Sequence, residues 1–197
     1  MRFVRSAVLV TAAAAVALIP TAANANTYRH TDAASDVVAL SGSSGTVTPQ
    51  PDRANGDVIG SSVRHTNRKI IAQMTFRDLA NADGFNGYAF SIKSNKVRRD
   101  VTVVGAAGIP SQVVVTKANG KKVSGCKVKR NIDLVAKSVT VKVPRKCLDN
   151  PKWVKVGMAT VFMTGFAPTD TQYADDAQFS GPIQPKSPLT YSPKIRR

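Results

Sequence analysis

The sequence predicts an all-β protein, an antiparallel β-sandwich of jelly-roll-like type with one disulfide. Three observations predict this fold. Apolar and polar residues alternate with a period of two in several separate stretches, as in strands with one buried face. All twelve acidic residues are Asp, and Asp favours turns and caps over helix interiors. Turn residues separate the alternating stretches, and no helical period lies between them.

The N-terminal segment is predicted to be a Sec-type signal peptide. Arg2 and Arg5 precede an apolar run over residues 7–19, and small residues end at Ala25, where cleavage is expected. The run is shorter than the about 20 residues that span a bilayer, which argues against the alternative of an anchoring helix. We therefore expect a secreted chain, residues 26–197, without a transmembrane segment.

The remaining chain is long enough for one domain with a core of its own. We expect residues 26–180 to form the β-sandwich domain. Residues 181–197 are rich in Pro and carry basic residues, so a flexible extended tail is predicted.

Strand patterns recur along the predicted domain. Asn119-Gly120 is a strong hairpin signal because both residues tolerate a positive φ. Gly157 and Gly165 are interpreted as bulges or bends. The stretches that alternate or are rich in β-branched residues are 70–76, 88–92, 101–104, 113–115, 139–143, 154–158 and 161–163.

The chain has two cysteines, Cys126 and Cys147. In an oxidising compartment an even number of cysteines favours a disulfide, which would stabilise the fold by about 3 kcal/mol. The alternative is a metal or redox pair, but the spacing fits no C-x-x-C motif. A structural disulfide is therefore predicted.

Paired Asp residues form the first candidate site. Two turns place two carboxylates each ahead of an apolar run, and a third pair near the end of the domain could join them. Calcium takes six to eight oxygen ligands, so these residues form a hypothesis of a calcium site, with no other cofactor predicted. The alternative is that Asp caps the turns through its own backbone, and neither motif fits an EF-hand loop. The six residues are Asp32, Asp36, Asp52, Asp57, Asp175 and Asp176.

A block of positive charge forms the second candidate site. Between Lys93 and Lys155, 16 Lys and Arg residues stand against three Asp, in a chain of net charge +16. If the strands of this block share one sheet, its solvent face is a field of lysines. The alternative is a solvated face whose lysines protect edge strands. The residues predicted to bind a polyanion are Lys127, Lys129, Lys142, Lys155, Arg145 and Lys146.

The basic block predicts an anionic partner other than nucleic acid. Trp153 is the only aromatic residue in it, whereas proteins that bind single strands interleave basic and stacking residues. No motif for specific nucleic-acid binding is present. An exported protein meets anionic envelope polymers, phospholipid head groups and acidic polysaccharides. We expect an exported binding protein with a basic sheet face, and the sequence leaves its oligomeric state open.

Catalysis is not expected. The chain has two histidines, His30 and His65, and lacks a G-x-S-x-G elbow, an H-E-x-x-H motif and a Gly-rich phosphate loop. A triad of His65 with a serine and an aspartate would make the protein a secreted hydrolase, the third-ranked hypothesis.

Several short motifs together resemble small exported actinobacterial proteins of unassigned function. They lie at residues 56–58, 62–66 and 76–79, and again at 143–148 and 151–154. This resemblance carries no binding residue with it.

A more distant resemblance rests on the Asp-rich entry, the hairpin and the strand end Phe76-Arg77-Asp78-Leu79. These features are similar to DOMON and carbohydrate-binding-module sandwiches. The resemblance implies a β-sandwich with ligand binding at its surface. The alternative function is a carbohydrate- or calcium-binding module. With one tryptophan, the chain departs from sugar binders that stack rings on an aromatic platform.

Overall fold

The computed structural model describes residues 26–42, 44–80, 84–106, 108–163, 165, 171–181, 183 and 188–197. The predicted signal peptide, residues 1–25, lies outside this part of the chain. Within it, no helix is long and apolar enough to cross a membrane.

The described chain consists of strands and one short 3₁₀ helix, so the all-β prediction is confirmed. Every strand pairing in the two sheets is antiparallel. The elements are β1 (Thr27–Thr31), β2 (Val38–Leu40), β3 (Val47–Pro49), β4 (Val58–His65), β5 (Lys69–Phe76), β6 (Phe85–Ser94), β7 (Arg98–Ala106), β8 (Ile109–Lys117), β9 (Lys129–Asp133), β10 (Ser138–Pro144), η1 (Arg145–Leu148), β11 (Trp153–Met163), β12 (Gln172–Asp176) and β13 (Ile195–Arg196).

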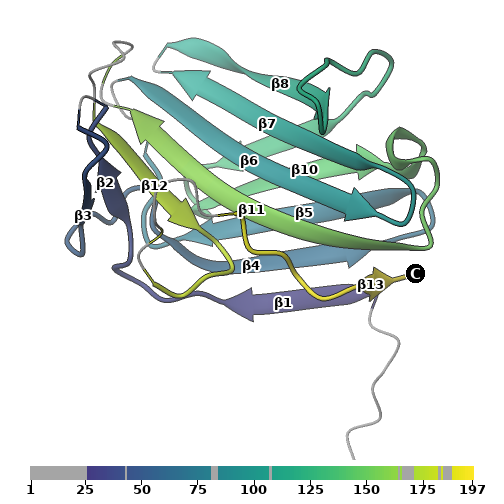
Figure 1. The fold of residues 1–197 in the computed structure, drawn as a ribbon, viewed down its shortest axis with the longest axis horizontal. Helices are drawn as coiled ribbons and strands as arrows, with labels where there is room; N and C mark the ends of the chain where they lie inside the picture. The colour runs from purple at the N-terminus through teal and green to yellow at the C-terminus, as the bar shows by residue number, and fades with distance from the viewer. Residues whose placement is uncertain are drawn as a thin grey trace, which may run out of the picture.

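The strands form two sheets that pack face to face, as predicted for a sandwich (Figure 1). The five-stranded sheet has the order β1-β4-β5-β10-β9. The eight-stranded sheet has the order β3-β2-β12-β11-β6-β7-β8, and β13 pairs with β11 beside it. Neighbours such as β5 and β10 are far apart in the sequence, so the topology depends on long-range pairing.

The core lies between the two sheets and is built by the alternating residues. In β10, for example, Val139, Val141 and Val143 are fully buried, whereas Lys142 between them is exposed. Aromatic rings make edge-to-face contacts in this core, the arrangement that aromatic pairs prefer. Phe76 of β5 meets Tyr88 of β6 across the two sheets, and Tyr88 meets Phe162 of the neighbouring strand β11.

All the predicted strand stretches lie in strands, but two of them belong together. Residues 154–158 and 161–163 form one continuous strand, β11. Gly157 is therefore no bulge, and its lack of a side chain admits another segment instead. A Cβ there would lie 2.7 Å from the Thr190 carbonyl oxygen. At Asn119-Gly120 the predicted turn is present, with Gly120 at φ +77°, but only a single bridge follows it.

The C-terminal residues differ from the free tail that the sequence predicts. Residues 188–197 are extended but run beside β11, because the end of β12 leaves this side of β11 open for pairing. Ser192 N–H donates to the Val156 carbonyl at 3.0 Å, and the Tyr191 hydroxyl lies 2.7 Å from Ser91 Oγ. For its described residues, this segment is part of the sandwich.

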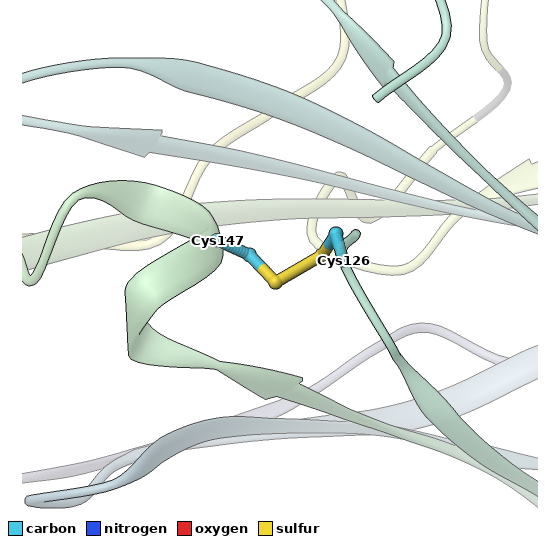
Figure 2. Close-up of a disulfide and its surroundings, with 2 residues drawn as sticks. All are labelled: Cys126 and Cys147. Atoms are coloured by element: carbon cyan, nitrogen blue, oxygen red, sulfur yellow. A yellow bond between two sulfur atoms is a disulfide. The ribbon is translucent and has the colours of Figure 1, made fainter. Parts of the chain in front are cut away.

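The predicted disulfide is confirmed. Cys126, in the segment before β9, is bonded to Cys147 in η1, with their Cα atoms 5.5 Å apart (Figure 2). The bond fixes η1 against the chain that leads into the edge strand of the five-stranded sheet. It therefore holds Arg145 and Lys146 of this helix in place.

Candidate functional site

Three aspartates from distant segments meet at one point, two of them buried and Asp36 half-buried. Asp36 lies in the turn before β2, Asp57 directly precedes β4, and Asp175 lies in β12. One carboxylate oxygen of each residue lies within 4.8 Å of the others. Asp57 and Asp175 are 0% and 1% exposed. We call these three residues the aspartate trio.

The turns that position the trio have a specific backbone requirement. Gly56, directly before Asp57, has φ +90°, and a Cβ at this position would lie 2.5 Å from the Phe162 ring. Thr160 Oγ1 donates to the Gly56 carbonyl at 3.1 Å. The glycine thus lets the chain pass over Phe162 and turn the Asp57 side chain inward.

Each carboxylate of the trio is only half satisfied. Its Oδ1 atom is buried and has no hydrogen-bond partner among the described residues. Such orphaned atoms are rare in native interiors, because their desolvation is not compensated. The Oδ2 atoms accept backbone N–H groups: Gly181 donates to Asp36 at 2.8 Å, Ser35 to Asp57 at 2.8 Å, and Val58 to Asp175 at 2.7 Å.

One cation accompanies the trio. Arg77 Nε lies 2.9 Å from Asp57 Oδ2, and Arg77 Nη1 donates to Ser35 Oγ at 2.6 Å. No other basic group in the described residues lies within 4 Å of these carboxylates. With all three aspartates ionised, the trio and Arg77 carry a net charge of −2.

The other predicted calcium ligands take different positions. Asp32 lies nearby, where Ser180 Oγ donates to its Oδ1 at 3.3 Å. Asp176 is satisfied at both oxygens by the N–H groups of Gln178 and Thr190. Asp52 is exposed and is not part of the trio. The structure thus brings together half of the six predicted residues.

The crowding of carboxylates has a clear electrostatic effect. Burial, opposed by the Val58 N–H and assisted by the charges of Asp36, Asp32 and Asp57, raises the pKa of Asp175 to about 8. Burial and the charge of Asp36 likewise raise the pKa of Asp32 to about 7. The pKa of Asp36 is raised mainly by burial. The cluster therefore favours a bound proton or a bound cation.

The predicted lysine field is split between the two sheets. Lys129 of β9 and Lys142 of β10 lie directly opposite each other on the outer face of the five-stranded sheet, and Lys127 is exposed just before β9. Lys155 belongs to β11 in the other sheet, where it lies opposite Lys93 of β6. A lysine lies between two valines in β10 and in β11 alike, but strand pairing places these two strands in different sheets. Lys155 therefore does not share a face with Lys127, Lys129 and Lys142, and the prediction of one common lysine face is wrong for Lys155.

Much of the positive charge gathers instead at one end of the sandwich, which we call the basic end. The β4–β5 turn, the β6–β7 turn, η1 and β13 meet there, near the label C in Figure 1. Arg145 N–H donates to the Arg68 carbonyl at 3.0 Å, and Lys152 N–H donates to Asn95 Oδ1 at 3.0 Å. Asp100 and Asp149 are the acidic residues among its described members. Its basic members are Arg64, Arg68, Lys69, Lys93, Lys96, Arg98, Arg145, Lys146, Lys152, Lys155, Lys194, Arg196 and Arg197.

A surface cavity of 560 Å³ opens at the basic end. Arg145 lies beside it, and burial together with the charge of Arg197 lowers the pKa of its guanidinium group. No acidic side chain of the described residues lines the cavity. Its lining consists of Asn26, Arg64, His65, Thr66, Asn67, Arg68, Lys69 and Arg197.

The side chains that the hydrolase and sugar-binding hypotheses depend on, His65 and Trp153, contact other groups of the protein. His65 is fully buried, and its Nδ1 lies 3.2 Å from the Ile195 carbonyl oxygen rather than beside a serine. Lys194 Nζ lies over the Trp153 ring, 4.9 Å from its centroid. The tryptophan face that could stack on a sugar ring is thus occupied by an ammonium group.

The sequence reasoning did not single out Arg64, Arg68 and Arg197 of the cavity. These residues lie outside the charge-rich segment 93–155, in stretches whose basic and acidic residues nearly balance. Charge counting along the chain therefore gives no signal for them. The hairpin that joins β4 and β5 offers a signal, because a turn at Asn67 places the basic residues beside it at one end of the sheet.

Comparison with protein-family models, with curated proteins and with solved structures finds no match to this chain. The resemblances to exported actinobacterial proteins and to DOMON and carbohydrate-binding-module sandwiches therefore stay predictions.

Proposed function

We propose that the protein is an exported, non-catalytic binding protein that associates with an anionic polymer of the cell surface through its basic end. The observation that carries the proposal is the 560 Å³ cavity. Arg64, Arg68, Lys69 and Arg197 line it, and no acidic side chain of the described residues does. Arginine side chains bind phosphate and carboxylate groups through paired hydrogen bonds, which suits a polymer with repeated anionic groups.

Like charges that face each other across strands support the same proposal. Lys93 of β6 lies between Lys155 of β11 and Arg98 of β7, directly opposite both. Lys129 and Lys142 form a third such pair outside the basic end, on the outer face of the five-stranded sheet. Like charges directly opposite each other destabilise a sheet, by roughly 0.2–1 kcal/mol per pair. A bound polyanion relieves this repulsion, so these pairs are better suited to binding than to stability.

The disulfide and the proposed cleavage after Ala25 support an extracellular location. Disulfides persist in oxidising compartments and are rare in the cytosol. Cys126–Cys147 also holds η1, and with it Arg145 and Lys146, at the basic end. An exported protein with such a surface meets envelope polymers rather than nucleic acid.

Binding of long-chain polyphosphate and of polygalacturonate to the purified protein tests the proposal. The affinity should fall at least about tenfold between about 50 mM and about 500 mM NaCl, because screening weakens exposed charge contacts. The triple variant Arg64→Gln, Arg68→Gln, Lys69→Gln should lose at least about tenfold in affinity at low salt. Comparing the two polymers separates phosphate from carboxylate recognition.

A matched triple variant, Lys117→Gln, Lys121→Gln, Lys122→Gln, removes the same charge at the exposed β8 turn and should bind nearly as the wild type does. The pair Lys129→Gln, Lys142→Gln tests the outer face of the five-stranded sheet separately. Equal losses of affinity in both triple variants would show that binding depends on net charge alone and not on the basic end. Absence of binding to both polymers at low salt would contradict it.

A further inference from the structure

We propose that Asp36, Asp57 and Asp175 bind a calcium ion. The site lies apart from the basic end and is independent of the proposed polyanion binding. Its three ligand-bearing segments are the turn before β2, the turn before β4, and β12.

The donor set selects the class of ion. The trio offers carboxylate oxygens only, and each residue places one oxygen within 4.8 Å of the others. Hard cations prefer oxygen ligands, whereas zinc and copper sites use His or Cys. Calcium accepts three aspartates together with carbonyl or water oxygens in flexible geometry, whereas magnesium demands a near-ideal octahedron.

The orphaned oxygens point to a missing ligand. Oδ1 of Asp57 and Oδ1 of Asp175 belong to side chains that are almost completely buried, and neither accepts a hydrogen bond from the described residues. Oδ1 of Asp36 is a third such atom. A cation at the point where the three carboxylates meet would offer a partner to these carboxylates, whereas local turn capping leaves their Oδ1 atoms unpartnered.

The Oδ2 contacts hold the carboxylates in place for such an ion. Each Oδ2 accepts a backbone N–H at 2.7 or 2.8 Å, so each carboxylate is fixed before an ion arrives. Preorganisation of this kind lowers the entropic cost of binding.

The charge at the site matches a divalent cation. Three ionised carboxylates and the Arg77 guanidinium give a net charge of −2, which one Ca²⁺ ion neutralises. Buried like charges at this separation repel strongly without such compensation. Asp176, whose oxygens are both satisfied by backbone N–H groups, is assigned to turn capping rather than to the ion.

The test is a calcium titration of the full purified protein after EDTA treatment, followed by calorimetry and by thermal unfolding. We expect saturable binding of one ion per chain. At a concentration about 100-fold above Kd, the Tm should rise by about 5–10 °C. The variants Asp36→Asn and Asp175→Asn should lose this response.

Asparagine keeps an oxygen for the backbone N–H and removes the charge, so both variants should stay folded without calcium, with a Tm at or above that of the wild type in EDTA. Asp52→Asn is the matched control and should keep the full calcium response. Retention of the response in Asp175→Asn, or no binding by the wild type, would overturn the proposal. An equal or larger Tm rise with magnesium would overturn the assignment of calcium.

Discussion

The two ends of the protein hold like charges in opposite ways. At the aspartate trio the charges are buried at Asp57 and Asp175 and half-buried at Asp36. They come from three distant segments, and each carboxylate has one oxygen bound to the backbone. At the basic end the charges are mostly exposed and lie on turns and strand ends around an open cavity. Water screens the charges of the basic end strongly and those of the trio only weakly.

This difference in burial determines whether the charges act on folding or on other molecules. Buried charges of one sign change the free energy of folding unless a proton, a counter-ion or a metal ion compensates them. Exposed charges change folding little and act mainly on molecules outside the protein. We therefore expect occupancy of the trio to change the stability of the fold, and the basic end to act on an external partner.

The largest expected effect is the removal of Arg77, the one cation beside the trio among the described residues. Arg77→Gln leaves Asp57 buried beside two other carboxylates and should lower the free energy of unfolding by about 3 kcal/mol in EDTA. The matched change at the basic end, Arg68→Gln, removes an exposed charge and should stay within about 0.5 kcal/mol of the wild type. Urea unfolding measures both. Similar losses in the free energy of unfolding for the two variants would contradict the proposed difference between the trio and the basic end.

The second expected effect is a pH dependence of stability that arises from the aspartates at and beside the trio. The pKa values of Asp175, about 8, and Asp32, about 7, lie above the ordinary value of 3.8 that applies in the unfolded chain. The folded state then binds more protons than the unfolded state, so stability is highest at low pH and falls as the pH rises from about 4 to about 8. The urea midpoint in EDTA should fall between pH 5 and pH 8.

Asp175→Asn removes one of the two groups and should flatten this fall in the urea midpoint. Calcium should flatten it as well, because the ion stabilises the ionised form. A midpoint that rises from pH 5 to pH 8 in EDTA would contradict the electrostatic description of the trio.

The smallest expected effect concerns the exposed lysines. Lys142→Glu replaces the repulsion with Lys129 by an attraction between opposite charges across β9 and β10. The free energy of unfolding should rise by about 0.2–1 kcal/mol at low salt, and the gain should shrink at high salt. The same variant should bind polyphosphate more weakly. Thermal unfolding and binding at two salt concentrations decide whether this face trades stability for affinity.

The strands could be predicted from the sequence because their signal is local. Alternation assigns Val139, Val141 and Val143 to one face and Lys142 to the other whatever the partner strands are. The partners themselves depend on long-range pairing. Lys142 and Lys155 show the same local pattern, but β10 pairs with β5 and β9 while β11 pairs with β6 and β12. No local pattern distinguishes these outcomes.

The candidate sites show the same limit. Asp36 and Asp57 could be predicted as site residues because each closes a turn ahead of a strand. Which aspartate of a pair turns inward depends on the backbone, as at Gly56, whose positive φ directs Asp57 rather than Asp52 into the interior. The basic end forms because four segments of the chain meet in space, and no local pattern in the sequence predicts that they lie close together.

His65 also bears on the order in which the protein folds. Its backbone N–H donates to the Asn26 carbonyl at 2.7 Å, and its Nδ1 lies 3.2 Å from the carbonyl of Ile195, 130 positions away. Contacts across such a separation form slowly, because a long loop must close before any stabilisation is gained. The end that bears the cavity therefore cannot be completed until residue 195 reaches β4. The surface for a partner should be the last part of this protein to mature, well after its hairpins have formed.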